Sequence, residues 1–278
     1  MKIILPLLLA LSCLVSRPLD EVIDDKTLVV GLYRDFPPYS FVENEQPKGI
    51  DVEIAQEVAK ALGVAPSWHW MGSDETLEDD LRSAIWRGHL INRKMADMMM
   101  RVPYDYDFIR QQESTGELSN ELVFMKAPYH SEGWAVGVNK QTISTFKDLS
   151  VFKKHKLAIE LDTLFDKFIM DADLAYRKNV IHFKYLQNAK EHIEQNKVDA
   201  LGGMRSQIQY YLHDKSKYIV KPFDIGVKPV WNIGVAVRSD SRDLGYEIEY
   251  IISELIKKGT IKKIFANYHA SWNPPIIE

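Results

Sequence analysis

The chain has 278 residues, of which 46% are hydrophobic and 27% charged, and its formal net charge is −4. This length and apolar content suffice for one large globular domain or for two lobes of ordinary size. The charges are interspersed rather than grouped in blocks, which argues against a nucleic-acid surface and against a polybasic membrane patch.

The first sixteen residues are typical of a secretory signal peptide. MKIILPLLLALSCLVS combines one lysine, an apolar run and small residues at Ala10 and Ser12, and the run is too short to span a bilayer. We therefore expect residues 1–16 to be removed and the mature protein to be periplasmic. Cleavage after Ser12 would instead leave Cys13, the only cysteine, as a site for a lipid anchor. With no second cysteine, the chain cannot form an intrachain disulfide.

The mature chain is expected to begin with a strand, an aromatic loop and a helix. The apolar run from Leu28 to Leu32 is typical of a strand buried on both faces, and a Pro-Pro pair follows it. A helix is predicted at 52–62, capped by Asp51 and ended by Gly63. Ligands of open α/β sheets lie beyond the carboxyl ends of the strands. The loop therefore supplies the first candidate ligand-binding residues, Arg34, Phe36, Tyr39 and Phe41.

Strands and helices alternate along the rest of the chain. A strand at 67–71 precedes a helix at 77–87, which Thr76 and Asp79 begin as a capping box, and a strand at 96–102 follows. Further strands are predicted at 122–124, 134–138, 156–160, 180–183, 198–201 and 230–238. Further helices are predicted at 164–169, 189–195, 206–212, 243–258 and 261–268. Two successive βα series favour an α/β protein with two lobes and a cleft between them.

Several segments, in this order, resemble the type II periplasmic binding proteins. They are FPPYSF, KGIDVEIAQEVAKALGV, ADMMMRVP, KAPYHSEGWAVGV, VDAL and KKGTIKKIFANY. The most similar branch is the bacterial extracellular solute-binding proteins of family 3, the receptors of polar amino-acid ABC importers. The resemblance implies a small-molecule ligand, an ABC permease as partner, a monomeric protein, and closure of the lobes around the ligand.

The resemblance also implies a domain organisation. Each lobe should be a mostly parallel sheet with helices on both faces, and two crossing strands should form the hinge. Lobe 1 is expected to comprise residues 17–130 together with 234–278, and lobe 2 to comprise residues 131–233.

Two anchors for an amino-acid ligand are absent from their expected positions. Members of this family hold the ligand carboxylate with an Arg after a Ser/Thr-rich strand end, and the ammonium group with an acid after the VDA strand. Here these positions fall on or beside Phe108 and at Met204. We therefore expect a ligand other than a standard α-amino acid. The candidate partners for an anionic group are Arg101, Arg110 and Arg205.

The run from Tyr104 through Asp105 and Tyr106 to Asp107 alternates rings and carboxylates at a strand end. Such a run could bind a cation by charge and by attraction to the ring faces, or it could be a solvated turn. The resemblance aligns Asp162 and Thr163 with a Gly-Thr pair that presents ligand-binding groups at a helix N-terminus. Asp162 is then either a plain N-cap or a carboxylate in the cleft.

Two other functions stay open. No nucleophile, cofactor-binding motif or metal site is predicted, so we expect a protein that is not an enzyme. Relatives whose strand end resembles the MMMRVP-Y-D segment accompany quinoprotein alcohol dehydrogenases, and this chain could likewise contact a periplasmic dehydrogenase. The fold also resembles that of cyclohexadienyl dehydratases, which makes a dehydratase-type enzyme the remaining alternative.

Overall fold

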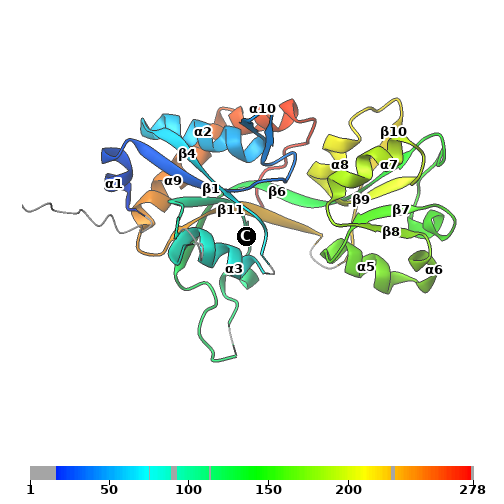
Figure 1. The fold of residues 1–278 in the computed structure, drawn as a ribbon, viewed down its shortest axis with the longest axis horizontal. Coiled ribbons are helices and arrows are strands. Elements are labelled where there is room, and N and C mark those ends of the chain that lie inside the picture. Colours follow the sequence, from blue (N-terminus) through cyan, green and yellow to red (C-terminus); the bar gives the residue numbers. More distant parts are fainter. Residues whose placement is uncertain (1–16, 75, 89–92, 113, 227–228, 277–278) are drawn as a thin grey trace, which may run out of the picture.

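The computed structural model describes residues 17–74, 76–88, 93–112, 114–226 and 229–276. Figure 1 shows two lobes joined by the long strands β6 (Val123–Asn139) and β11 (Val230–Arg238). The predicted α/β class and two-lobed architecture are therefore confirmed. The predicted boundaries at 130/131 and 233/234 fall inside these two shared strands and stay a prediction. The predicted signal peptide lies outside the described residues.

One sheet of nine strands runs through both lobes. Besides β6 and β11 it contains β1 (Thr27–Tyr33), β4 (Ala65–Met71), β5 (Met98–Tyr104), β7 (Leu157–Glu160), β8 (Val180–Phe183), β9 (Ala200–Met204) and β10 (Tyr218–Phe223). The strand order is β4-β1-β5-β11-β6-β9-β7-β8, and β10 also pairs with β6. In lobe 1, β1 is parallel to β4 and β5. In lobe 2, β7 is parallel to β8 and β9. β11 is antiparallel to β5 and β6, and β9 and β10 are antiparallel to β6.

Strand β6 corrects the prediction of two short strands at 122–124 and 134–138. It is a single strand of 17 residues. Its middle contains Pro128 and Gly133, which favour a turn in the sequence. In the structure Pro128 falls where the register between β6 and β11 shifts, and a proline at a bulge withholds no ladder hydrogen bond. Strand β10 was not predicted at all.

Helices cover both faces of the strands in each lobe. The described helices of lobe 1 are α1 (Leu19–Asp24), α2 (Ile50–Leu62), α3 (Leu77–Leu81), the π-helical turn η1 (Arg82–Trp86), α4 (Tyr106–Ile109), α9 (Arg242–Lys257) and α10 (Thr260–Asn267). In strand β5, Met98 and Met100 pack on the face covered by α2, whereas Met99 packs with Leu81 and Ile85 on the other face. A separate hairpin pairs β2 (Phe41–Glu43) with β3 (Gln46–Lys48).

Lobe 2 repeats this layering with its own helices. They are η2 (Leu149–Lys153), α5 (Leu164–Ala172), α6 (Leu174–Arg177), η3 (Leu186–Ala189), α7 (Lys190–Glu194) and α8 (Arg205–Tyr211). Phe165 of α5 packs on one face of the sheet, and Ile193 of α7 and Ile208 of α8 pack on the other. Each face of the sheet thus has its own buried apolar cluster, which is what a parallel strand buried on both sides requires.

Three predicted helix starts can be compared with the structure. Thr76 caps α3 by accepting a hydrogen bond from the Asp79 N–H, as predicted. Asp51 does not cap α2, because Gly49 occupies the N-cap and Asp51 is buried inside the first turn. Asp162 does not cap α5 either, because Thr163 takes that role and accepts from the Asp166 N–H.

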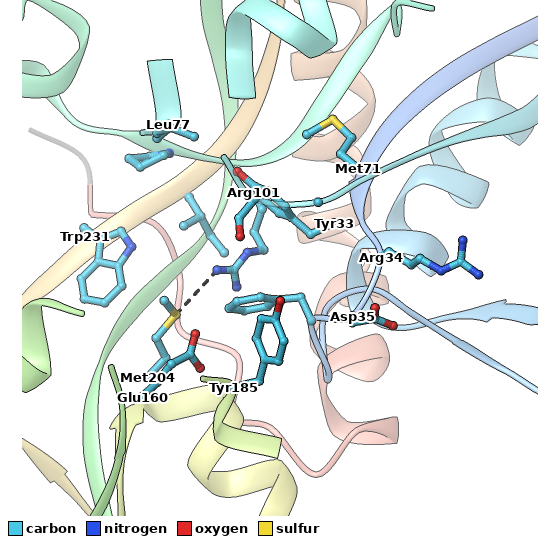
Figure 2. A pocket seen from close by; sticks show the side chains of 15 residues that line it. Tyr33, Arg34, Asp35, Met71, Leu77, Arg101, Glu160, Tyr185, Met204 and Trp231 are labelled. Atoms are coloured by element: carbon cyan, nitrogen blue, oxygen red, sulfur yellow. Dashed lines mark hydrogen bonds between the residues drawn. The ribbon is translucent and has the colours of Figure 1, made fainter. Parts of the chain in front are cut away.

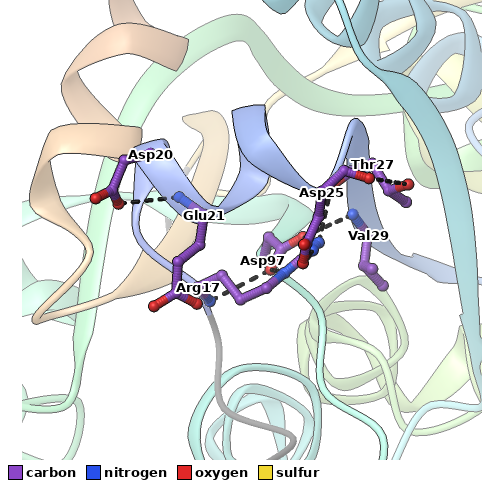
Figure 3. A network of polar contacts seen from close by, with 7 residues as sticks. All are labelled: Arg17, Asp20, Glu21, Asp25, Thr27, Val29 and Asp97. Carbon is purple, nitrogen blue, oxygen red and sulfur yellow. Dashed lines mark hydrogen bonds and ion pairs between the residues drawn. The ribbon is translucent and has the colours of Figure 1, made fainter. Parts of the chain in front are cut away.

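The first described residue is tied to the sheet of lobe 1 (Figure 3). The Arg17 guanidinium donates to both carboxylate oxygens of Asp97, at 2.6 and 3.1 Å, and to the Thr27 carbonyl at 2.8 Å. Asp97, which is 2% exposed, also accepts from the Val29 N–H. These bonds join the start of β1 to the segment before β5. None of the helices in the described part of the chain is long and apolar enough to cross a membrane.

Candidate ligand-binding site

A cavity of about 420 Å³ lies between the two lobes. Its walls are the carboxyl ends of β1, β4 and β5 from lobe 1 and of β7, β8 and β9 from lobe 2. Proteins with parallel α/β sheets bind their ligands at this edge of the sheet. The lining residues are Tyr33, Arg34, Asp35, Phe36, Met71, Gly72, Ser73, Leu77, Arg101, Pro103, Glu160, Tyr185, Met204, Trp231 and Ile233.

Arg101 projects into the middle of this cavity (Figure 2). Gly234 pairs with Val102 and Val235 with Met100, so Arg101 sits in a β-bulge of β5. Its φ is +67°, in the left-handed region that residues other than glycine rarely adopt. A bulge re-aims a side chain, and strained backbone of this kind is concentrated at functional sites.

Two aromatic rings hold the Arg101 guanidinium. Its central carbon lies 3.8 Å from the centre of the Phe36 ring and 4.3 Å from that of Tyr39. The attraction between a cation and a ring face grows when water is excluded. From lobe 2, the Met204 sulfur lies 3.6 Å from Nη2. The buried Nε atom has no hydrogen-bond partner among the described residues. The guanidinium can therefore still donate a hydrogen bond.

Lobe 2 supplies a carboxylate to the same cavity. Glu160 ends β7, beside Met204 in Figure 2, and accepts a hydrogen bond from the Leu186 N–H at 3.0 Å. Burial raises the pKa of Glu160, while the Leu186 N–H and the positive charge of Arg101 oppose that shift. A cation and an anion therefore face one small cavity from opposite lobes. Much of the remaining wall is apolar or aromatic: Tyr33, Met71, Leu77, Pro103, Trp231 and Ile233.

Tyr39 connects the Arg101 pocket with the hinge. Its buried hydroxyl donates to Glu132 Oε2 at 2.5 Å and is hydrogen-bonded to the Ser206 hydroxyl at 3.1 Å. Glu132, which lies in β6, also faces Arg205 Nε at 3.9 Å. Arg205 Nη2 donates to the Ser131 carbonyl at 2.5 Å. The network thus joins the lobe 1 loop, the hinge strand and the start of α8 in lobe 2.

Two buried ionisable groups lie behind the cavity. Burial raises the pKa of Asp51 to about 7, while the charge of Arg101 and a hydrogen bond from the Tyr129 hydroxyl (2.7 Å) hold it lower than burial alone would. Burial lowers the pKa of His130 to about 4, although the negative charge of Glu132 opposes this shift. Near neutral pH, His130 is therefore uncharged and Asp51 is close to its titration midpoint.

Four of the predicted ligand-binding residues lie in or behind the cavity. Arg34, Phe36 and Arg101 line it, although the Arg34 side chain points away from Arg101 in Figure 2. Tyr39 packs behind Arg101 and does not line the cavity. Phe41 lies elsewhere and contacts the rings of Tyr210 and Tyr268.

The run from Tyr104 to Arg110 does not gather around the cavity. Asp105 caps α4 by accepting from the N–H groups of Asp107 and Phe108. Tyr106 is exposed, and the Arg110 guanidinium lies over its ring at 4.3 Å. Tyr104 packs into the apolar cluster beneath α3. These contacts resemble the solvated-turn alternative, and the run lies outside the cavity between the lobes.

The predicted residues of lobe 2 have structural partners. Asp162 is exposed, with φ +61°, and its N–H donates to Asp166. Thr163 caps α5, and Arg205 faces Glu132. The sequence missed Glu160, Tyr185 and Tyr33 as cavity residues. Their position immediately at or after a strand end, the same signal that indicated Phe36, could have found them.

The chain belongs to the bacterial extracellular solute-binding proteins, family 3, whose model matches residues 28–271. The fold just described and a cleft between two lobes agree with that family. The resemblance inferred from the sequence motifs is therefore confirmed.

Among curated proteins, the L-cystine-binding protein TcyJ of Escherichia coli (strain K12) is 28% identical over 154 residues, which cover 54% of this chain and 49% of TcyJ. The match thus spans about half the length of that relative. Among solved structures, the Ancestral Cationic Amino Acid Solute Binding Protein (AncCDT-1) has a TM-score of 0.69 at 21% identity and covers 90% of this chain and 99% of its own. An amino acid ABC transporter substrate-binding protein from Streptococcus pneumoniae bound to L-arginine has a TM-score of 0.64 at 18% identity, covering 90% and 97%. At such identities, the structures show a shared fold.

Proposed function

We propose that this solute-binding protein captures a small ligand carrying both an anionic and a cationic group, with the anion on Arg101 and the cation at Glu160. The observation that carries the proposal is that these two opposite charges line one cavity from different lobes. A guanidinium forms strong charge-assisted hydrogen bonds with carboxylates, and a carboxylate complements an ammonium group. A ligand that joins the two residues would favour the closed arrangement of the lobes.

The size and the walls of the cavity narrow the ligand class. A volume of about 420 Å³ suits a molecule of amino-acid to dipeptide size. Met71, Leu77 and Trp231 offer apolar surface to the rest of that molecule. An amino acid or a close analogue with a sizeable side chain therefore fits best.

The expected exclusion of standard α-amino acids loses its support. It rested on the loss of two family anchors, and Met204 indeed stands at one of these positions and lines the cavity. Arg101, within β5, and Glu160, at the end of β7, however, provide the same pair of charges from other positions. The names of the relatives, which mention L-cystine and L-arginine, agree with an amino-acid ligand.

The family supports a proposal for location and partners. We propose that this extracellular solute-binding protein works in the periplasm and delivers its ligand to an ABC permease, and that it does so as a monomer. The accessory role beside a quinoprotein dehydrogenase remains a prediction without support from the site. A dehydratase function would need a positioned general acid, and Glu160 would be the candidate. A structural neighbour described as an amino-acid-binding precursor of cyclohexadienyl dehydratase keeps this second function in view.

The experiment is a calorimetric and thermal-shift screen of matched compounds. Each L-amino acid, together with L-cystine and small dipeptides, is compared with its decarboxylated amine and with its deaminated acid. We expect that binding requires both the anionic and the cationic group of the ligand. Arg101→Met and Glu160→Gln should each weaken binding of the hit by about 10- to 100-fold, the loss typical of a charge-assisted hydrogen bond. Arg110→Met, outside the cavity, is the matched control and should bind like the wild type. A hit that binds equally well without its carboxylate would contradict the assignment of Arg101.

A further inference from the structure

The segment that follows α10 crosses both hinge strands. The Trp272 indole N–H donates to the Tyr129 carbonyl of β6 at 2.8 Å, and the Asn273 carbonyl accepts from the Ser131 N–H at 3.0 Å. Farther along, Ile276 exchanges two hydrogen bonds with the Asn232 side chain of β11, at 2.7 and 2.8 Å. The segment 269–276 therefore forms a third strap across the hinge and is fixed to lobe 1 through α10.

The same segment also contacts lobe 2 through α8. The Gln209 side chain accepts from the Ser271 N–H at 2.8 Å and donates to the Ser271 hydroxyl at 3.1 Å. Just beyond α8, the His213 ring stacks on the His269 ring, with centroids 4.2 Å apart and planes 11° from parallel. Because the strap is anchored to lobe 1 and to the hinge, rotation of lobe 2 must break or move these contacts.

The surroundings of the stacked rings are positively charged. His213 and His269 line a surface groove of about 670 Å³ together with Lys140 and Lys215, and none of the described residues lining it is a carboxylate. Asp214 follows His213 in the chain, but its carboxylate accepts from the N–H and hydroxyl of Ser216 and faces Lys217. Nδ1 of His213 is hydrogen-bonded to the Tyr210 carbonyl at 2.9 Å. The side chain of Tyr210 is neutral in the acidic range, since burial raises its pKa above the ordinary value.

We propose that His213 and His269 form a pH-sensitive latch between the lobes, which holds the present lobe arrangement while the rings are neutral and releases it when both are protonated. Two stacked imidazolium rings repel each other, and the lysines add to that repulsion. Histidine is the side chain that gains its charge between pH 8 and pH 5.5. Acid therefore loosens the α8 side of the hinge independently of any ligand.

The test measures the distance between the lobes by pulsed electron paramagnetic resonance, without ligand. Spin labels are attached at Lys60→Cys on α2 and Lys178→Cys after α6, two exposed positions, in the full chain carrying Cys13→Ser. The wild-type background should show one distance population at pH 8 and a second, shifted population at pH 5.5. His213→Ala should show the shifted population already at pH 8.

The control is the double variant His213→Phe, His269→Phe, which keeps two stacked flat rings that cannot gain a proton. Its distance distribution should be the same at both pH values. This variant retains Asp51 and His130, so a shift that survives in it would belong to those groups and would overturn the proposal. The single variant His269→Gln, which also cannot be protonated, should likewise lose the pH response. A wild-type distribution that does not change between pH 8 and pH 5.5 would overturn the latch as well.

Discussion

The centre of the Tyr39 ring lies 4.3 Å from the guanidinium carbon of Arg101, while the hydroxyl of the same tyrosine donates a hydrogen bond of 2.5 Å to Glu132 Oε2 of the hinge strand β6. One side chain therefore positions the cation of the candidate site and joins the hinge. Tyr39 acts on the site through Arg101, as a positioning residue, because it does not line the cavity.

Tyr39→Phe separates these two roles. The variant keeps the ring against Arg101 but leaves Glu132 without its tyrosine donor. A buried group that loses a hydrogen-bond partner costs about 1–3 kcal/mol, and we expect the free energy of unfolding, measured by urea denaturation, to fall by that amount. Phe36→Leu is the comparison, since it removes a ring from Arg101 and no hydrogen bond. If Tyr39→Phe proved as stable as the wild type, the Tyr39–Glu132 bond would not contribute to stability.

Gly49→Ala should displace the loop that carries Tyr39. A Cβ atom at Gly49, where φ is +125°, would lie 2.2 Å from the Tyr39 carbonyl oxygen. Backbone atoms on both sides must then move, and we expect a loss of more than about 3 kcal/mol in the free energy of unfolding. Gly226→Ala is the matched control: φ is +73° there, but no atom lies within 4 Å of the added Cβ. That variant should cost only about 1 kcal/mol; similar losses in the two variants would contradict the prediction.

Asp51 and His130 should give the stability opposite pH dependences that largely cancel. The folded-state pKa of Asp51 is raised to about 7, so its contribution falls as pH rises from about 4 to 7. The folded-state pKa of His130 is lowered to about 4, so its contribution falls as pH drops from about 6.5 to 4. The combined contribution of these two groups to the free energy of unfolding should therefore be almost the same at pH 5 and at pH 6.5 in the wild type.

Single substitutions should expose each slope. In Asp51→Asn, only the pH dependence that comes from His130 remains. The free energy of unfolding should then rise from pH 5 to 6.5 by up to about 1.4 kcal/mol per pH unit. In His130→Gln, only the pH dependence that comes from Asp51 remains, and the free energy of unfolding should fall over the same interval. Urea unfolding at the two pH values measures both. Slopes of equal sign in the two variants would be incompatible with the buried environments described here.

Arg17→Met should destabilise lobe 1. It removes the side-chain bonds from Arg17 to Asp97 and leaves that buried carboxylate with two backbone donors, the N–H groups of Val29 and of residue 17. We expect a loss of about 1–3 kcal/mol in the free energy of unfolding. Lys60→Met, which removes an exposed pair with Glu57, should change stability by less than about 0.5 kcal/mol. Hydrogen exchange should locate the Arg17→Met effect at the start of β1; exchange unchanged there would contradict this account.

The sequence predicted those parts of the molecule that depend on local pattern. The run from Leu28 to Leu32 and the helical spacing in 52–62 are local signals, and both elements formed at these places. Strand β6 was predicted as two pieces on either side of the segment 126–133, which contains Pro128 and Gly133. The partner strand β11, far along the chain, decides the outcome there.

The candidate site was predicted only in part, for the same reason. Phe36 and Arg101 were found because they stand beside strand ends or within a strand with an apolar pattern. Glu160 lies opposite Arg101 because of how the two lobes pack together. A local sequence pattern carries no information about that packing. The left-handed backbone at Arg101 also escapes the sequence, because an arginine seldom signals φ > 0.

The β-bulge at Arg101 constrains how this binding protein can evolve. In a regular strand, a ligand anchor can be exchanged for another side chain with little consequence for the backbone. At a φ of +67°, most replacements retain the strain and lose the contact of the guanidinium with the rings of Phe36 and Tyr39. Glycine would relax the backbone but would leave the cavity without its cation. A change of ligand class therefore requires the bulge, the aromatic loop and the anchor to change together, and single substitutions would more readily adjust the lobe 2 side, at Glu160 and Met204.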